Sequence, residues 1–305
     1  MIKLTTFGES HGVAVGGVIE GCPAGMRLDR QLIDDELARR ATGKTSSASQ
    51  RREADEVEFL SGLLDGVTLG TPIAFLVRNT DARPGDYEAM KDTFRPSHAD
   101  FTYQAKYGIR DWRGGGRASA RAMLPYVVAG AIAKQMLKPK GITIRAEVLS
   151  IGGETDPLRM EAVLNQCREE GDTVGGVVRG HIIGLPAGLG EPLDNKFQAC
   201  LAKAMFTIPA VKGFEYGDGF AMASMRGSEA NDALIVDDDG TSRFQSNHSG
   251  GIQGGITNGE EVFFNVAFKP IPTLGRGHRH DVCALPRAVV IVEAMAAWTV
   301  VQLMP

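Results

Sequence analysis

The sequence of 305 residues, with a mass of 32.6 kDa, is long enough for one large domain or two medium ones and needs no disulfide or structural metal to stabilise its core. Its 33 Lys and Arg residues against 37 Asp and Glu leave a formal charge of −4. This balance argues against a general nucleic-acid-binding protein, because such proteins carry a basic excess. Four widely spaced cysteines without a C-x-x-C pair predict neither a zinc site nor a disulfide framework.

The most apolar stretch, residues 284–301, is interrupted by Arg287 and Glu293, so the sequence predicts no membrane span. The N-terminal residues show no charged segment followed by an apolar one, as a secretory leader would. We therefore expect a cytoplasmic protein.

Glycine and arginine are both abundant. Glycine supplies 38 residues, about 12% of the chain against a usual level of about 7%, and arginine outnumbers lysine by 22 to 11. Glycine lets the backbone approach a ligand closely, and the planar guanidinium matches phosphate and carboxylate groups. The two together predict a site for a small molecule with several negative charges. A GC-rich genome, which favours both codon families, is the alternative explanation.

Hydrophobic periodicity and turn residues predict a mixed α/β or α+β protein in which strands and helices are interspersed. In chain order, the expected elements are a strand at 13–20, an amphipathic helix at 29–40 capped by Asp29, a strand at 72–78, an apolar helix at 117–137, strands at 142–151 and 174–183, a helix opened by Asp194, a strand at 260–268 and a final apolar helix at 284–303.

The chain repeats itself weakly. Residues 17–26 match residues 180–189 at six of ten positions, and residues 62–70 resemble residues 251–259. Because the predicted elements follow in the same order after each match, we interpret the chain as an internal duplication within one domain of residues 1–305. The halves lie near 1–140 and 170–305, share one core and contribute turns to one ligand site. Chance similarity between glycine-rich turns is the alternative.

One motif resembles a nucleotide-binding loop in its residues but is not placed between a strand and a helix, as such a loop requires. Residues 38–45 end in Gly43-Lys44-Thr45, which fits a relaxed P-loop pattern. A true P-loop follows a buried strand and opens a helix, so that helix N-terminal amides cradle phosphate. Here the preceding residues 29–40 are expected to be a helix, and its C-terminal end favours cations. The sequence therefore argues against nucleotide hydrolysis.

Two histidines stand in motifs that suit a site. Ser10 and His11 lie in Phe7-Gly-Glu-Ser-His-Gly12, where the glycines predict a tight turn that exposes both side chains. His98 lies in Phe94-Arg-Pro-Ser-His-Ala-Asp100, which is typical of a helix start with Ser97 as cap and Asp100 as the acidic partner. His98 would then lie in the first helical turn, where the helix dipole favours anions. Histidines that only satisfy loop hydrogen bonds are the alternative in both cases.

The most suggestive stretch runs from Arg110 to Arg121 and holds four arginines around three consecutive glycines. The glycines predict a loop whose amides can face an oxyanion, and Arg117 and Arg121 are expected on one face of the following helix, close to Ser119. Without a counter-anion the arginines would repel one another; a solvated basic face is the alternative. The motif of His278, His280 and Asp281 could suggest a metal site. No additional ligand stands at a fixed spacing from this motif, so no metal site is expected.

Taken together, these motifs resemble those of chorismate synthase. Residues 7–12 resemble its first signature, residues 114–121 its second, and residues 277–281 through 286–288 its third. The resemblance also covers residues 93–103, 217–220, 226–228 and 246–252, so it runs in order along nearly the whole chain. It implies an α+β fold, a β-α-β sandwich built from two internally duplicated halves, assembled as a homotetramer.

The resemblance further implies a lyase that converts 5-enolpyruvylshikimate 3-phosphate to chorismate and phosphate by an anti-1,4-elimination, as the last common step of the shikimate pathway. Such enzymes need reduced FMN. The flavin donates an electron transiently to the substrate and recovers it as the C6 hydrogen leaves. A substrate with a phosphate and two carboxylates suits a pocket rich in arginine and glycine. Neither nucleic acid nor membrane is implied.

Residue roles follow from the same resemblance. His11 would protonate the departing phosphate, His98 would lie by the flavin ring, and Ser10, Ser119 and Asp281 would shape proton removal. The residues implied at FMN are Arg117, Ala118, Ser119, Pro209, Ala210, Gly254, Lys269, Pro270, Ile271, Pro272, Thr273 and Arg279. Those implied at the substrate are Arg40, Arg121, Arg287 and Ser46, with Arg40 also the contact to NADPH in bifunctional members.

The sequence departs from the family pattern at several positions. Ala122, Met123 and Tyr126 replace polar residues of the second signature, Ser46 replaces an arginine for which Lys44 is a possible substitute, and the stretch after Thr273 is short. A non-catalytic flavin- or anion-binding homologue is therefore the alternative function. An unrelated phosphosugar-binding protein, which would not bind flavin, is a third.

Overall fold

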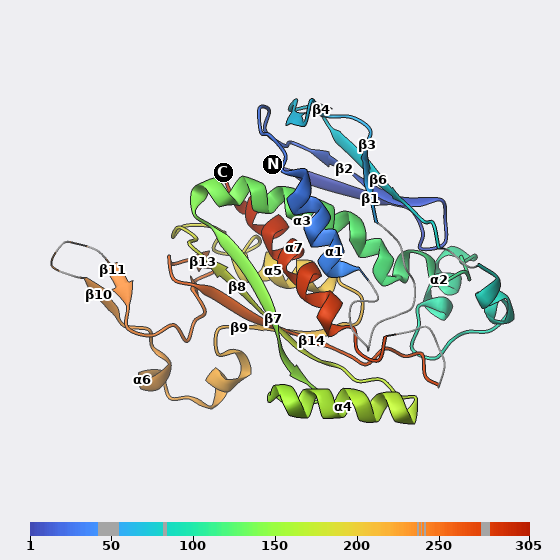
Figure 1. Ribbon diagram of the computed structural model, residues 1–305. Coiled ribbons are helices and arrows are strands. Elements are labelled where there is room, and N and C mark those ends of the chain that lie inside the picture. The colour runs from blue at the N-terminus through green and yellow to red at the C-terminus, as the bar shows by residue number, and fades with distance from the viewer. Residues whose placement is uncertain (42–54, 82–83, 237, 239, 241, 276–280) are drawn as a thin grey trace.

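The chain folds into two antiparallel sheets with a layer of helices between them (Figure 1). This computed structural model describes every residue of the chain except 42–54, 82–83, 237, 239, 241 and 276–280. The layered arrangement confirms the α+β sandwich expected from the resemblance.

The first sheet is antiparallel and has the strand order β1-β2-β6-β3. Its strands are β1 (Lys3–Phe7), β2 (Ala14–Glu20), β3 (Val57–Phe59) and β6 (Ile73–Arg78). Alternate side chains of β6, namely Ile73, Phe75 and Val77, are at most 1% exposed and face the helical layer. This period of two is why the segment forms a half-buried strand.

The second sheet has the matching order β7-β8-β14-β9. Its strands are β7 (Thr143–Ile151), β8 (Gly176–Ile183), β9 (Val211–Tyr216) and β14 (Val262–Phe268). On the face toward the helices, Gly180 of β8 leaves room for Phe264 of β14, whose ring would lie 2.2 Å from a Cβ at position 180. The two central strands can therefore pair with a large aromatic side chain buried between them.

Four helices make up the middle layer: α1 (Arg30–Arg40), α3 (Leu124–Leu137), α5 (Phe197–Phe206) and α7 (Leu285–Leu303). α3 packs along α7, and the two helices face the first and second sheets respectively. α7 is long and apolar enough to cross a membrane by length and composition, but 78% of its apolar window is buried inside the protein. Its apolar surface is thus accounted for by core packing.

A buried carboxylate ties the helical layer together. Glu293 of α7 is 4% exposed, and its oxygens accept two hydrogen bonds from Arg39 of α1, at 2.7 and 2.8 Å, and one from Lys134 of α3 at 2.6 Å. The backbone amide of Ala146 on β7 adds a fourth bond of 3.0 Å. Burial alone would raise the pKa of Glu293, but these partners outweigh it and hold the pKa below its usual value.

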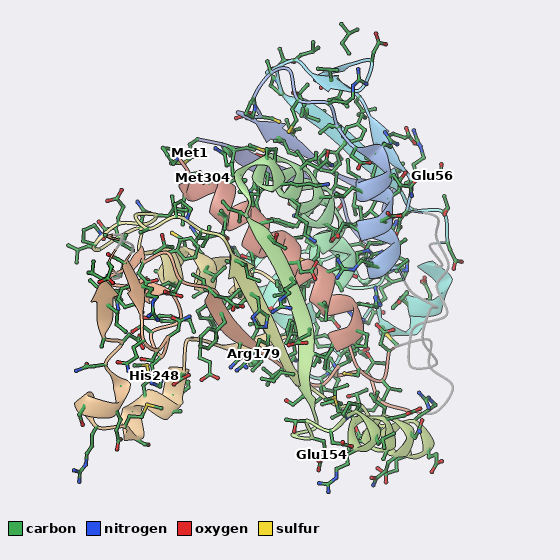
Figure 2. All side chains as sticks on the ribbon, turned by 60° about the vertical axis from the view of Figure 1, so that its left-hand side comes forward. Met1, Glu56, Glu154, Arg179, His248 and Met304 are labelled. Carbon is green, nitrogen blue, oxygen red and sulfur yellow. The ribbon has the colours of Figure 1, made fainter. Side chains whose placement is uncertain are left out.

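The remaining elements are short or peripheral. They are η1 (Pro84–Met90), α2 (Asp100–Tyr107), η2 (Gly116–Ala118), η3 (Ala120–Met123), η4 (Lys138–Lys140), α4 (Pro157–Glu170), η5 (Gly219–Ser224), α6 (Gly227–Ala230), and the hairpins of β4 (Leu63–Leu64) with β5 (Val67–Thr68), β10 (Leu234–Val236) with β11 (Ser242–Phe244), and β12 (Ile252–Gln253) with β13 (Ile256–Thr257). The excursion through α6, β10 and β11 projects from the body, with His248 beside it (Figures 1 and 2). Both termini lie together at one end of the molecule.

The expected elements are largely confirmed, with two differences in helix boundaries. Asp29 caps α1 by accepting from the amide of Leu32 at 3.2 Å, as predicted. Asp194 does not cap α5, which begins after Lys196. The helix expected at 117–137 is divided into η2, η3 and α3, because Pro125 fits only in the first turn of a helix.

The matching strand orders of the two sheets fit an internal duplication. The hairpins β4-β5 and β12-β13 also occupy matching places in the chain order. The proposed repeat boundaries and the single domain of residues 1–305 stay predictions; β7 already belongs to the second sheet although it precedes residue 170.

We expect Gly130→Ala to destabilise the protein. A Cβ at position 130 of α3 would lie 2.4 Å from the Cα and Cβ of Ala294 on α7, so the helices would have to separate. The overlap should lower the free energy of unfolding by about 1–3 kcal/mol, despite the roughly 1 kcal/mol gained from helix propensity. Denaturant unfolding measures the change. Gly227→Ala, where no atom lies within 4 Å, is the control with the same chemical change; a Gly130→Ala variant as stable as wild type would contradict the packing account.

Candidate functional site

A cavity of about 1520 Å³ opens at the end of the helical layer where α3 and α7 begin. Its wall combines segments from both halves of the chain, including the β1–β2 loop, the turn before α3, and the stretch after β14. The expected site residues that line it are His11, Arg40, His98, Arg117, Ala118, Ser119, Arg121, Pro209, Ala210, Lys269, Ile271, Pro272, Thr273, Asp281 and Arg287. The structure therefore brings most of the proposed site to one place.

Several expected residues lie elsewhere. Ser10 is fully buried behind the wall, and Pro270 lies between two lining residues without lining the cavity itself. Gly254 lies in the turn of the β12-β13 hairpin. The backbone amide of Phe197, the first residue of α5, donates to a carbonyl of this turn. The other end of α5 reaches the cavity at Thr207, and ten helical residues span about 15 Å. Gly254 is thus not at this cavity; Ser46, Arg279, His278 and His280 lie outside the described residues.

The loop between β1 and β2 presents His11 to the cavity. The Ser10 hydroxyl lies 3.0 Å from His11 Nδ1 and donates to the carbonyl of Gly114 at 3.2 Å, so the hydroxyl oxygen accepts from Nδ1. His11 Nε2 is then the nitrogen at which a proton can be gained or lost. A Cβ at Gly114 would lie 2.1 Å from the imidazole, so only glycine allows this contact. The prediction that Ser10 is exposed is wrong, because its side chain docks the loop onto the glycine turn.

His98 lies just before α2. The N-cap of α2 is Ala99, without a side-chain hydrogen bond, so Ser97 is not the expected cap and His98 is not in the first helical turn. Ser97 instead takes a positive φ of 56° and its carbonyl accepts from Lys269 Nζ at 3.0 Å. His98 Nε2 lies 3.1 Å from the Thr273 hydroxyl. These two contacts fix the His98 segment to the stretch after β14.

Asp100 organises the segment that carries His98, and it does so differently from the predicted helix cap. Its carboxylate accepts two side-chain bonds of 2.8 Å and a backbone bond of 3.0 Å from Arg95. Arg110 lies 3.7 Å away and donates to the carbonyls of Met90, Lys91 and Thr93. Burial alone would raise the pKa of Asp100, but its bonds and the two guanidinium charges outweigh burial and lower the pKa to about 2.

The arginines of the glycine-rich turn have partners within the protein, which corrects the expectation that they would repel one another without a bound anion. Asp111 accepts bonds of 2.7 and 3.1 Å from Arg113, and Arg117 donates to the Thr6 hydroxyl at 2.7 Å and the Gly8 carbonyl at 3.2 Å. Arg117 and Arg121 belong to separate short 3₁₀ turns, so they do not share a helix face as predicted. Both nevertheless line the cavity.

A buried carboxylate joins the two arginines expected at the substrate. Asp55 Oδ2 accepts from Arg40 at 2.6 Å, and Asp55 Oδ1 accepts from Arg121 at 2.9 Å. The three side chains are at most 5% exposed. Burial raises the pKa of Asp55, but the two guanidiniums outweigh this effect and lower it overall. Arg40 Nε has no hydrogen-bond partner in the described part of the chain.

The third arginine comes from the other half of the chain. Arg287, in the first turn of α7, donates to Asp281 at 2.5 Å and to the carbonyl of Arg40 at 3.3 Å. Burial lowers the pKa of Arg287, although Asp281 opposes the shift. Arg40, Arg121 and Arg287 thus meet at one wall. Within the ranges that the structure describes, no group of three or more His, Cys, Asp or Glu side chains could hold a metal ion.

Comparison with known proteins identifies the family. The family model for chorismate synthase matches residues 2–304, nearly the whole chain. This chain belongs to the chorismate synthase family. Chorismate synthases are lyases of aromatic biosynthesis that need reduced FMN, and the function expected from the sequence is in agreement with this assignment.

Similar proteins match this chain over most of their length. Chorismate synthase of Porphyromonas gingivalis is 49% identical over 336 residues, covering 97% of this chain and 91% of that protein. Chorismate synthase of Christiangramia forsetii is 50% identical over 338 residues, with 97% and 94% covered. A crystal structure of a chorismate synthase superposes with a TM-score of 0.81 at 31% identity, covering 99% of this chain and 91% of the other. Because both alignments exceed 305 positions, these relatives carry segments that this chain lacks.

The departures from the second chorismate synthase signature lie in packed positions. Ala122 and Met123 belong to η3 and are 5% and 3% exposed, and Tyr126 is half-buried in the first turn of α3. Met123 also lines the cavity. These residues therefore replace polar groups by apolar packing against the core without removing any of the charged groups described above.

Sequence reasoning missed two residues that organise the site. Asp55 was not singled out because it lies far from every motif, and its neighbours in sequence are ordinary charged residues. Asn79 follows β6 and accepts from Arg121 Nε, while its amide nitrogen donates to the carbonyls of Glu9 at 3.1 Å and Gly12 at 2.8 Å. It thus brackets Ser10 and His11. A polar residue directly after a buried strand was the available signal.

We expect Asp100→Asn to lower stability in a pH-dependent way. A native pKa of about 2, against 3.8 for the free carboxyl, corresponds to about 2 kcal/mol of stabilisation. Because the native pKa is lowered, this contribution is present above pH 4 and is lost as the pH falls toward 2. The difference in free energy of unfolding between wild type and variant should therefore narrow from pH 6 to pH 3. A difference that stays constant over that range would contradict the assigned role of the carboxylate.

Proposed function

We propose that this chain catalyses the chorismate synthase reaction, the 1,4-elimination of phosphate from 5-enolpyruvylshikimate 3-phosphate. The observation that carries the proposal is the convergence of His11, His98, the buried Arg40 and Arg121 and the partly buried Arg287 on one cavity wall. The substrate's phosphate and two carboxylates need such cationic donors. The roles of the individual site residues belong to the same proposal.

The cavity fits two anionic ligands. Its volume of about 1520 Å³ is larger than the roughly 300–1,000 Å³ usual for one small-molecule site. The N-termini of α3 and α7 lie in the wall without side-chain caps, and such helix ends favour anions. Arg40 Nε is a buried donor without a hydrogen-bond partner in the described ranges. Donors of this kind suit bound carboxylate and phosphate groups.

The residues present also fit FMN. Arg117, Ala118 and Ser119 face the cavity from the turn before α3, and Pro209 and Ala210 join them from the segment after α5. Lys269, Ile271, Pro272 and Thr273 complete the proposed flavin contacts, and Pro270 lies between Lys269 and Ile271 in the chain. When bound, reduced FMN supplies a transient electron to the substrate. His98, held by Thr273, would contact the flavin ring.

The protein's own groups would handle protons and anions. His11, with Nδ1 bonded to Ser10, can deliver a proton from Nε2 to a phosphate oxygen as the C–O bond breaks. Arg40, Arg121 and Arg287 would hold the substrate's anionic groups. Asp281, fixed by Arg287, and Ser119 would shape removal of the C6 proton. In the net 1,4-elimination the C6–H bonding pair forms a new ring double bond, the existing ring double bond shifts to the phosphate-bearing carbon, and the C–O bonding pair leaves with phosphate.

Three further proposals rest on the family resemblance. They are a homotetrameric assembly, a cytoplasmic location, and reduction of FMN by NADPH with Arg40 as a contact. Size measurement in solution tests the first. Turnover under anaerobic conditions with FMN and NADPH but no chemical reductant tests the last, because only a bifunctional enzyme would form product.

Anaerobic turnover with dithionite-reduced FMN tests the proposed reaction. Chorismate absorbance and phosphate release are followed together on 5-enolpyruvylshikimate 3-phosphate, and we expect equal amounts of both products. Binding of flavin and substrate without product would instead favour the non-catalytic homologue. The replacement of signature residues by Ala122 and Met123 is the sequence feature that supports this alternative. Failure to bind flavin would contradict the proposed cofactor site and rule out the alternative that keeps flavin without chemistry.

We expect His11→Ala and His98→Ala each to lower kcat by roughly 10²–10⁴-fold, the usual contribution of a positioned acid–base group. The control is His181→Ala. His181 lies on β8 of the second sheet, is bound to Glu261 and does not line the cavity. It should retain wild-type turnover. If either variant at position 11 or 98 keeps near-wild-type turnover, that residue has no part in the chemistry.

A further inference from the structure

Asn79 uses both polar atoms of its side chain on the loop that carries His11 and on Arg121. It directly follows β6, and its Nδ2 donates to the carbonyls of Glu9 at 3.1 Å and Gly12 at 2.8 Å. Its Oδ1 accepts from Arg121 Nε. Because a guanidinium only donates and a carbonyl only accepts, these partners fix which way the amide points. An aspartate of the same length would offer no donor to the two carbonyls.

The two carbonyls belong to the ends of the turn that holds His11. The amide of Gly12 donates to the Glu9 carbonyl at 3.1 Å, which closes a turn over residues 9–12. The backbone amide of Asn79 adds a bond of 3.1 Å to the carbonyl of Val13. The end of β6 therefore holds this turn through its first residue, its last residue and the residue that follows.

The imidazole of His11 has close neighbours outside its own turn. Tyr87 packs against it edge-to-face, with ring centroids 5.0 Å apart and planes at 74°. A Cβ at position 114 would lie 2.1 Å from the ring, so the backbone of Gly114 contacts it closely. The Ser10 hydroxyl, which bonds to Nδ1, is itself anchored on the Gly114 carbonyl. A turn that shifts relative to Tyr87 and Gly114 would therefore displace the ring from these contacts.

We propose that Asn79 is a positioning residue for His11: its amide clamps the turn of residues 9–12, so that the imidazole keeps its contacts with Tyr87 and Gly114 and delivers its proton from Nε2. Asn79 itself does not line the cavity, so it acts through His11. The proposal rests on the proposed function, which takes His11 as the acid that protonates the departing phosphate.

Asn79→Asp separates the clamp on the turn from the contact with Arg121. The carboxylate has the same shape as the amide and still accepts from Arg121 Nε, but the donors to Glu9 and Gly12 are lost. A small displacement of a catalytic group is costly, so we expect kcat to fall roughly 10–100-fold. KM for 5-enolpyruvylshikimate 3-phosphate should change by less than about threefold, because the lost bonds act on the acid and not on substrate binding.

Asn247→Asp makes the same chemical change outside the cavity and serves as the matched control. Asn247 Nδ2 donates to the Glu261 carbonyl at 2.8 Å, and its Oδ1 accepts from the amide of Gly251 at 2.7 Å, so it also holds a loop through its side chain. It does not line the cavity. The control variant should lower Tm at most and keep wild-type kcat. A loss of kcat at position 79 no larger than that at position 247 would overturn the proposal.

A double-mutant cycle with His11→Ala distinguishes positioning of His11 from general support of the fold. If Asn79 acts through His11, Asn79→Asp lowers kcat in the wild-type background but by less than about twofold in the His11→Ala background. A residue that only supports the fold would lower kcat by the same factor in both backgrounds, and that result would overturn the proposal. Turnover is measured well below the Tm of each variant, so that unfolding does not contribute.

Histidine hydrogen–deuterium exchange, followed by mass spectrometry, tests the same link without flavin, substrate or turnover. Here the variant is Asn79→Ser, which adds no charge near the imidazole and covers failure of Asn79→Asp to fold. Exchange at the ring carbon between the two nitrogens depends on the hydrogen bonds of the ring. We expect exchange at His11 to accelerate roughly threefold or more, as for loss of about one hydrogen bond, while His181 and His248 exchange as in wild type.

Unchanged exchange at His11 in Asn79→Ser would overturn the proposal, whatever the kinetic results. Equal acceleration at His181 and His248 would overturn it as well, because the change would then be a general loosening of the fold. Wild-type protein that makes no chorismate would refute the proposed function, and the exchange at His11 would still decide the role of Asn79.

Discussion

The need to compensate buried charge governs how this protein builds its site. Arg40, Arg121 and Arg287 lie at the end of the helical layer with little exposure to water, and Asp55 and Asp281 neutralise them at short range. Because the partners come from segments far apart in sequence, each ion pair also fixes one segment to another. Removing one member of such a pair costs about 3–5 kcal/mol, so the cavity wall and the stability of the fold cannot be separated.

The same principle operates deeper in the molecule. Glu293 binds Arg39, which directly precedes Arg40 at the end of α1, and Lys134 of α3. The ion pairs of Glu293 with Arg39 and Lys134 thus fix the position of the end of α1 relative to α3 and α7. Cavity geometry therefore depends on a network in the middle of the helical layer, and both halves of the chain contribute to it. Because segments from the N-terminal and C-terminal parts of the chain both line the cavity, this network also holds the cavity wall together.

Much of the fold could be predicted from the sequence, because its signals are local. Alternating apolar residues in Ile73–Arg78 and the cap at Asp29 mark a strand and a helix start without reference to the rest of the chain. The motifs likewise pointed to His11, His98 and Arg121. What local signals could not supply were long-range partners: Asp55 binds Arg121 across 66 positions, and Asn79 binds it across 42. The helix start predicted at Ser97 is wrong for a local reason, since Asp100 binds Arg95, five positions before it, instead of taking part in a cap.

A crystal structure of the chain with FMN and 5-enolpyruvylshikimate 3-phosphate bound would test the account most directly. We expect both ligands to occupy the cavity at the start of α3 and α7, with a substrate carboxylate or phosphate on Arg40 Nε and Arg121, His11 beside the departing phosphate, and His98 against the flavin. A substrate bound elsewhere, or bound in the cavity without contact to Arg40 and Arg121, would contradict it.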